Sequence, residues 1–146
     1  MILENGPSHT KDLYQAKKDL DKYGYCLIPE ALSDEEIKSA KDRLLEQAEA
    51  EERLGLSFRD GGEKQEVKFK DGKIDKDSFS EANGGINQRL WMLVNKGSCF
   101  RDMVIHPLVD ELVGLILGQD FILSTHSANI AKPGGVRMGL HTDQWW

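Results

Sequence analysis

The residues with the clearest potential for chemistry lie near the end of the sequence, in the tripeptide His141-Thr142-Asp143. In an extended strand, residues two apart project to the same side, so this imidazole and this carboxylate converge on one point. They are two of the three ligand types in the 2-His-1-carboxylate arrangement that holds Fe(II) and leaves coordination positions open. The spacing therefore predicts a metal site with His141 and Asp143 as ligands. Such short motifs also arise by chance, and the alternative is a surface carboxylate beside a core histidine.

Two extended segments must position this pair. Residues 121–131 have the pattern of a strand with apolar ends and a polar middle, and alternation places His126 and Asn129 on opposite faces. A Lys-Pro-Gly-Gly run at 132–135 interrupts the strand, and a second extended segment follows over 136–146. We expect the two segments to lie antiparallel or nearly so.

A longer pattern contains the tripeptide. The segment Ser127-Ala128-Asn129-Ile130-Ala131-Lys132-Pro133-Gly134, a short spacer and then Leu140-His141-Thr142-Asp143-Gln144-Trp145-Trp146 resembles the first half of the catalytic core in the phytanoyl-CoA dioxygenase family. Upstream, Gly24-Tyr25-Cys26-Leu27-Ile28-Pro29 and the helical region from Phe100 to Gly118 resemble that family too. The resemblance covers most of the chain and is weakest over 56–85.

The resemblance implies an Fe(II)- and 2-oxoglutarate-dependent dioxygenase that uses O₂ to hydroxylate a small organic or acyl substrate. His141 and Asp143 would be its catalytic metal ligands, and Asp143 favours hydroxylation over halogenation, which needs a small residue there. His126 and Asn129 would bind the cosubstrate, although His126 could equally be a core histidine. Trp145 and Trp146 would either pack in the core or wall the substrate pocket.

The family pattern also needs a distal histidine and a 2-oxoglutarate-binding arginine, and both would follow Trp146. The 26 residues after Asp120 suffice for about two or three strands, fewer than a jelly roll requires. We therefore expect the chain to be the N-terminal part of a longer enzyme, to be inactive alone, and to associate through unpaired strand edges.

Local signals predict helices before the strands. Thr10 is a candidate cap for a helix that ends near Tyr23, and a short strand is expected over 25–28. Ser33-Asp34-Glu35-Glu36 is a capping box, which predicts a helix to about Leu54. Further helices are expected at 98–104 and 107–117, the last one ending at Gly118.

Between these helices, residues 56–86 form a charged, glycine-rich insertion. Its Asp71-Gly72 pair predicts a hairpin turn, because both turn positions favour residues that tolerate positive φ. The insertion is either a solvated loop or a flap over a site, and its composition fits both.

The composition limits which classes of protein this chain can belong to. The chain has 146 residues, 39% hydrophobic and 30% charged, with a net charge of −6, which disfavours nucleic acid as a partner. No segment is apolar enough for a membrane span, and two cysteines without zinc spacing suggest reduced thiols in a cytoplasmic protein. We expect one truncated α+β domain, in which N-terminal helices pack on the first strands of a double-stranded β-helix (jelly roll, cupin-like), the barrel being incomplete in this chain. Its expected parts are 10–55, 56–86, 98–118 and 121–146.

Two rival functions remain open on sequence alone. One is a non-catalytic binding or scaffold domain in which the His-Thr-Asp tripeptide is incidental. The other is a zinc site, although zinc hydrolases usually present two closely spaced histidines, and the sequence has no HxH or HxxxH.

Overall fold

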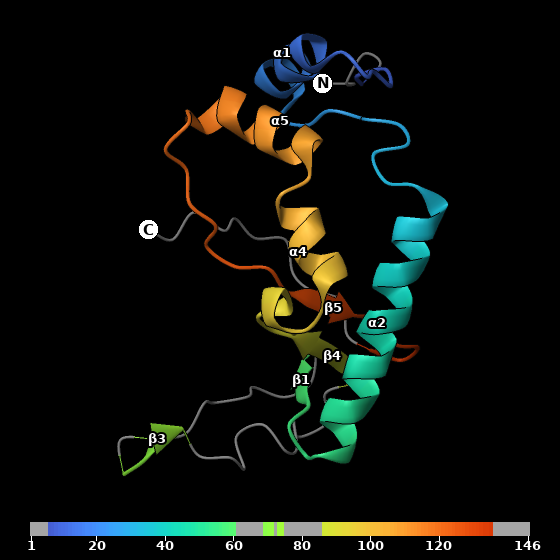
Figure 1. Cartoon of the computed structure of the whole chain (residues 1–146), viewed down its shortest axis with the longest axis vertical. Helices are drawn as coiled ribbons and strands as arrows, with labels where there is room; N and C mark the ends of the chain where they lie inside the picture. The colour runs from blue at the N-terminus through green and yellow to red at the C-terminus, as the bar shows by residue number, and fades with distance from the viewer. Residues whose placement is uncertain (1–5, 61–68, 72, 75–85, 136–146) are drawn as a thin grey trace. The chain divides into compact units, whose positions relative to one another are not determined.

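The computed structural model describes residues 6–60, 69–71, 73–74 and 86–135 (Figure 1). The chain divides into two compact units, the first made of Met1–Asp42 and Val94–Ser124, the second of Arg43–Leu93 and Thr125–Trp146. The expected single domain stays a prediction. In the described part of the chain, no helix is both long and apolar enough to cross a bilayer.

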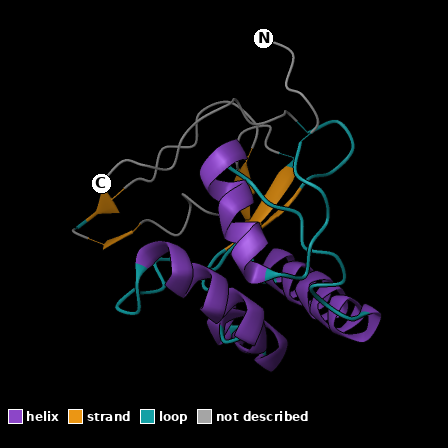
Figure 2. Cartoon of the chain, turned by 90° about the horizontal axis from the view of Figure 1, so that it is seen from above, coloured by secondary structure: helices purple, strands orange, loops and turns teal. Residues whose placement is uncertain are grey.

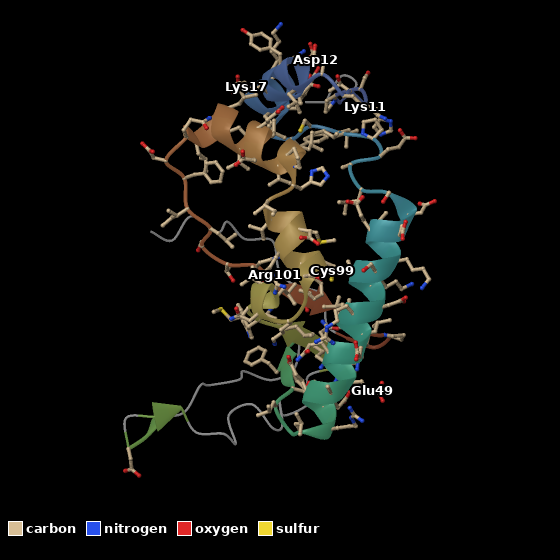
Figure 3. The ribbon with its side chains drawn as sticks, in the orientation of Figure 1. Lys11, Asp12, Lys17, Glu49, Cys99 and Arg101 are labelled. Atoms are coloured by element: carbon tan, nitrogen blue, oxygen red, sulfur yellow. The ribbon has the colours of Figure 1, made fainter. Side chains whose placement is uncertain are left out.

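The first helix of the first unit, α1 (Leu13–Tyr23), begins at a different cap from the predicted one. Oδ1 of Asp12, the residue labelled at the start of α1 in Figure 3, accepts the amide of Tyr14 at 2.9 Å, whereas Oγ1 of Thr10 accepts the amide of Asp12 at 3.1 Å. The prediction of Thr10 was wrong, because the carboxylate both accepts the free amide and carries negative charge at the positive end of the helix. The predicted end is confirmed, with Gly24 left-handed at φ 79°.

The predicted strand at 25–28 is reduced to one isolated parallel bridge between His9 and Leu27. The amide of Thr10 donates to the carbonyl of Leu27 at 2.9 Å. A strand needs a partner of similar length, and the described residues supply only this short one, so the segment remains irregular.

The capping box is confirmed at the start of α2 (Asp34–Arg53), which ends where the sequence predicts. The hydroxyl of Ser33 accepts the amide of Glu36 at 3.3 Å. In return, the carboxylate of Glu36 accepts the amide of Ser33 at 2.8 Å and its hydroxyl at 2.7 Å. These reciprocal bonds satisfy donors that would otherwise face water at the helix start.

This capping box makes a pH-dependent contribution to stability. The hydroxyl of Ser33, and next its amide, hold the pKa of Glu36 below its ordinary value of 4.5. Because the pKa is lower in the folded state, the contribution is complete above the ordinary pKa and is lost as the pH falls through the folded pKa. Ser33→Ala is therefore expected to flatten the pH dependence of the unfolding free energy below about pH 4.5.

Urea unfolding of the wild type, Ser33→Ala and the control Ser39→Ala, measured between about pH 3 and pH 6, checks this expectation. Ser39 is exposed on the same helix and makes no bond to Glu36 that would shift its titration. Parallel pH profiles for the wild type and Ser33→Ala would contradict it.

Both later helices of the first unit have their predicted bounds, α4 at Ser98–Val104 and α5 at Pro107–Leu117. His106 caps α5, since its Nδ1 accepts the amide of Leu108 at 3.2 Å. α5 packs beside α1, and buried apolar side chains in this unit include Ala16, Ala40 and Phe100.

The second unit contains a three-stranded antiparallel sheet in the order β1 (Phe58–Asp60), β4 (Asn87–Leu90) and β5 (Ala128–Ile130). The strands are short beside the helices (Figure 2). The middle strand is tied to the second half of α2, because Nε2 of Gln88 donates to the carbonyl of Ala48 at 2.9 Å. Gln88 is 1% exposed, and Leu90 and Leu93 are also buried.

The hairpin predicted within the insertion is confirmed. β2 (Phe69–Lys70) and β3 (Lys73–Ile74) pair antiparallel, with Phe69 opposite Ile74. Asp71 has a φ of 54°, as the first residue of such a turn requires. Gly72, the second residue of the predicted turn, lies outside the described residues.

The strand predicted over 121–131 is mostly wrong, since only Ala128–Ile130 is extended in the sheet. The ladder between β5 and β4 ends at the pair Leu90 and Ala128. Beyond Leu90 the neighbouring chain turns away, with Met92 at φ 57° and a 3₁₀ turn η1 at Leu93–Asn95. Residues 121–127 therefore lack a partner strand in the described part of the chain. The described residues form no closed barrel, and the jelly roll stays a prediction.

Candidate functional site

Strand β5, in the second unit, contains or adjoins the residues predicted to bind the cosubstrate. This strand lies at one side of β4, with Asn129 opposite Arg89 and Ile130 opposite Gln88. Burial alternates along it, because Ala128 and Ile130 are half-buried and Asn129 is exposed. The predicted alternation of faces is confirmed for these three residues.

The two residues predicted to bind the cosubstrate lie at or beside this strand. His126 is half-buried, its Nδ1 is enclosed, and its carbonyl accepts the amide of Leu93 at 2.9 Å. Asn129 presents an exposed side chain. Because the half-buried imidazole of His126 and the exposed amide of Asn129 lie on opposite faces, they do not contact one ligand from the same side. Cosubstrate binding by both residues therefore stays a prediction.

After β5 the chain makes a tight turn over residues 132–135. The amide of Gly135 donates to the carbonyl of Lys132 at 2.9 Å, and Gly134 has a φ of 83°. Oδ1 of Asn87, on β4, accepts the amide of Lys132 at 3.2 Å. The predicted break of the strand at this run is confirmed.

An ionic group flanks the turn. Nζ of Lys132 lies 3.9 Å from a carboxylate oxygen of Glu52 near the end of α2, and Arg59 of β1 pairs with the same carboxylate. Arg59 also donates to the carbonyl of Ile86 at 3.2 Å. The pair of Lys132 and Glu52 is half-exposed, so solvent screens it and its contribution to stability is small.

The predicted metal ligands His141 and Asp143 lie outside the described residues, as do Trp145 and Trp146. Among residues 6–60, 69–71, 73–74 and 86–135, no group of three or more His, Cys, Asp or Glu side chains could hold a metal ion. Any iron site must therefore draw on residues outside those ranges.

A comparison with known proteins bears on this site. A protein named as a dioxygenase is similar to this chain. It is dioxygenase af480 of Aspergillus fumigatus, with 31% identity over 135 residues. The match covers 92% of this chain and 38% of that protein, so the chain spans less than two fifths of its relative's length. No protein-family model matches the chain, and no solved structure matches it significantly.

Sequence reasoning missed a cavity of about 240 Å³ in the first unit. It is lined by the first turns of α2, by α4 and by the cap of α5, and its walls are Leu32, Glu35, Glu36, Ser39, Cys99, Asp102, Met103 and His106. Cys99 and Asp102 come from one face of α4, and a hydrophobic pattern alone gives no signal for a cavity whose walls combine polar and apolar side chains. Neither of the predicted cosubstrate residues, His126 and Asn129, is among these walls.

Proposed function

We propose that this chain contributes two metal ligands to an Fe(II)- and 2-oxoglutarate-dependent dioxygenase that hydroxylates a small organic or acyl substrate. The observation that carries the proposal is the similarity to a protein named as a dioxygenase over 92% of the chain. The His-Thr-Asp tripeptide also supports it, because it supplies two of the three donors of an oxygen-activating iron site.

The donor chemistry fits Fe(II). A neutral imidazole nitrogen from His141 and a carboxylate oxygen from Asp143 would hold the metal together with a further histidine, and the protein also binds 2-oxoglutarate and O₂. Bound iron supplies the O₂ chemistry that couples decarboxylation of 2-oxoglutarate to oxidation of a substrate C–H bond. The chain's own part is to fix the direction of the two ligands and to exclude water.

The fold proposed for this activity is a double-stranded β-helix, or jelly roll, in which β5 is an early strand. The antiparallel pairing of β5 with β4 and the turn at 132–135 support this, since both precede the segment with the tripeptide. His126, half-buried beside this strand, is the residue we propose to face the cosubstrate.

Uncoupled turnover tests the proposal without knowledge of the substrate. The full-length protein, freed of metal with a chelator and reloaded with Fe(II), should form succinate from 2-oxoglutarate only in the presence of O₂. Chelation should abolish this activity, and Zn²⁺ should not restore it, because zinc has no redox chemistry. Absence of succinate at every metal loading would refute the proposal and favour a binding domain.

A further inference from the structure

We propose that His106 is a pH-sensitive helix cap, which holds the first turn of α5 while its imidazole is neutral and releases that turn when the imidazole is protonated. The inference lies wholly within the first unit and does not depend on the proposed function. His106 is half-buried, precedes Pro107 and has an extended backbone, with φ −62° and ψ 128°.

The cap depends on one bond from the side chain. Nδ1 of His106 accepts the amide of Leu108 at 3.2 Å. Leu108 is the second residue of α5, so no carbonyl within the helix can accept its amide. Pro107 has no amide hydrogen. The amides of Val109 and Asp110 both donate to the backbone carbonyl of His106, at 2.9 and 3.0 Å. In this turn, the Leu108 amide is therefore the donor whose acceptor can titrate.

Protonation removes this bond. An imidazole nitrogen that accepts a hydrogen bond carries no proton, so the bond requires neutral His106 with its proton on Nε2. In the imidazolium both nitrogens are donors, and Nδ1 would face the Leu108 amide donor to donor. The new positive charge would also lie at the positive end of the helix dipole. Imidazole is the side chain that ordinarily changes charge between about pH 5 and pH 8, so this is the interval in which to look for the release.

Two cavities meet at His106, and their walls contain the other charged and titratable groups that face it. One, of about 240 Å³, includes Glu35 and Glu36 of α2 and Cys99 and Asp102 of α4, and the other, of about 640 Å³, includes Lys11, Glu30, Asp34 and Glu36. All of these groups except the half-buried Cys99 are exposed, Lys11 pairs with Glu30, and Glu36 is bonded to Ser33. Attraction between an imidazolium and exposed carboxylates is screened and typically weaker than a helix cap. These carboxylates therefore do not compensate for the loss of the cap.

Release of the cap should affect the wall that α5 contributes to the larger cavity. His106 and Leu108 both line this cavity, and α5 packs beside α1. A helix start without a cap frays more readily, because its free amide must find another partner. Acidification should therefore loosen the first turn of α5 while the rest of the helix stays folded.

Hydrogen exchange at the Leu108 amide tests the proposal in the full-length protein. Protection is the exchange rate of an unfolded peptide divided by the observed rate at the same pH, which removes the intrinsic pH dependence of exchange. We expect this protection to fall about fivefold between about pH 8 and pH 5, the ratio that corresponds to loss of a typical cap. The capping box of α2 should stay intact over this interval, because its bonds to Ser33 hold the pKa of Glu36 below 4.5.

Three variants distinguish a titrating cap from other causes. His106→Asn keeps a side chain that caps helices but does not titrate, so protection at Leu108 should be high at both pH values. His106→Ala removes the acceptor, so protection should be low at both. The matched control is His9→Ala, which removes an exposed histidine of the same unit and should keep the pH dependence of the wild type.

Equal protection of the wild-type Leu108 amide at the two pH values would overturn the proposal. A fall in His106→Asn as large as that in the wild type would also overturn it, because a different group would then be titrating. Wild-type protection in His106→Ala at about pH 8 would show that the side chain is not the cap. If His106→Ala does not fold, the comparison of the wild type with His106→Asn still decides.

Discussion

Asp143→Ala in the full-length protein is expected to lower 2-oxoglutarate-dependent succinate formation by more than about 100-fold, a greater loss than removal of an outer partner causes. The physical reason is that a missing carboxylate removes both a bond to iron and the geometry that selects this metal. His141→Ala should have the same effect. Succinate formed per minute at saturating Fe(II) and 2-oxoglutarate is the measurement.

The matched control is Asp120→Ala, which removes an exposed carboxylate that follows α5. It should retain full activity, and all three variants should unfold at the same urea concentration as the wild type. Full activity in Asp143→Ala would refute the assignment of the tripeptide as the metal site. Loss of activity together with loss of folding would do so too, because it would give Asp143 a structural role.

The largest expected effect on stability belongs to Leu90→Ala. Leu90 is 0% exposed at the end of β4, where it pairs with Ala128 at the last rung of the ladder. Removing its buried methyl groups loses transfer free energy and leaves a cavity, which together typically cost about 2–5 kcal/mol. Urea unfolding followed by far-ultraviolet circular dichroism measures this loss.

Leu54→Ala is the control for the same chemical change in the same unit, since Leu54 is 72% exposed. Its effect should stay within about 0.5 kcal/mol. Equal losses for the two variants would mean that Leu90 is not part of a packed core.

The sequence predicts the helices because their signals are local. The four residues from Ser33 to Glu36 contain both halves of a capping box, and Pro107 and Gly118 mark the two ends of α5. The cap of α1 was misplaced by two residues, since Thr10 and Asp12 are both good caps and only the folded chain decides between them.

The strands depend on contacts between residues far apart in the sequence, and this explains why the strand predictions were less accurate. Asn87-Gln88-Arg89-Leu90 has no apolar alternation, so a hydrophobic pattern does not identify β4. Its burial depends on the carbonyl of Ala48, 40 residues away. Conversely, residues 121–127 have strand-like composition but pair with no strand in the described part of the chain.

In the candidate site, too, local patterns are visible in the sequence and contacts between distant residues are not. The spacing of His141 and Asp143 is visible in the sequence, because two ligands on one strand form a local pattern. The bond that Asn87 makes to the turn at Lys132 is not visible there, since it joins residues 45 apart. Outer contacts of a site are set by tertiary packing, and a single sequence does not record them.

The nature of the buried side chains has a thermal consequence. Of the six apolar residues buried in the described part of the chain, three are alanines, at positions 16, 40 and 48. Alanine removes little apolar surface from water, and the heat capacity of unfolding rises with the apolar surface exposed. The stability of these helices should therefore change only gradually with temperature, giving broad calorimetric transitions and little loss of stability on cooling.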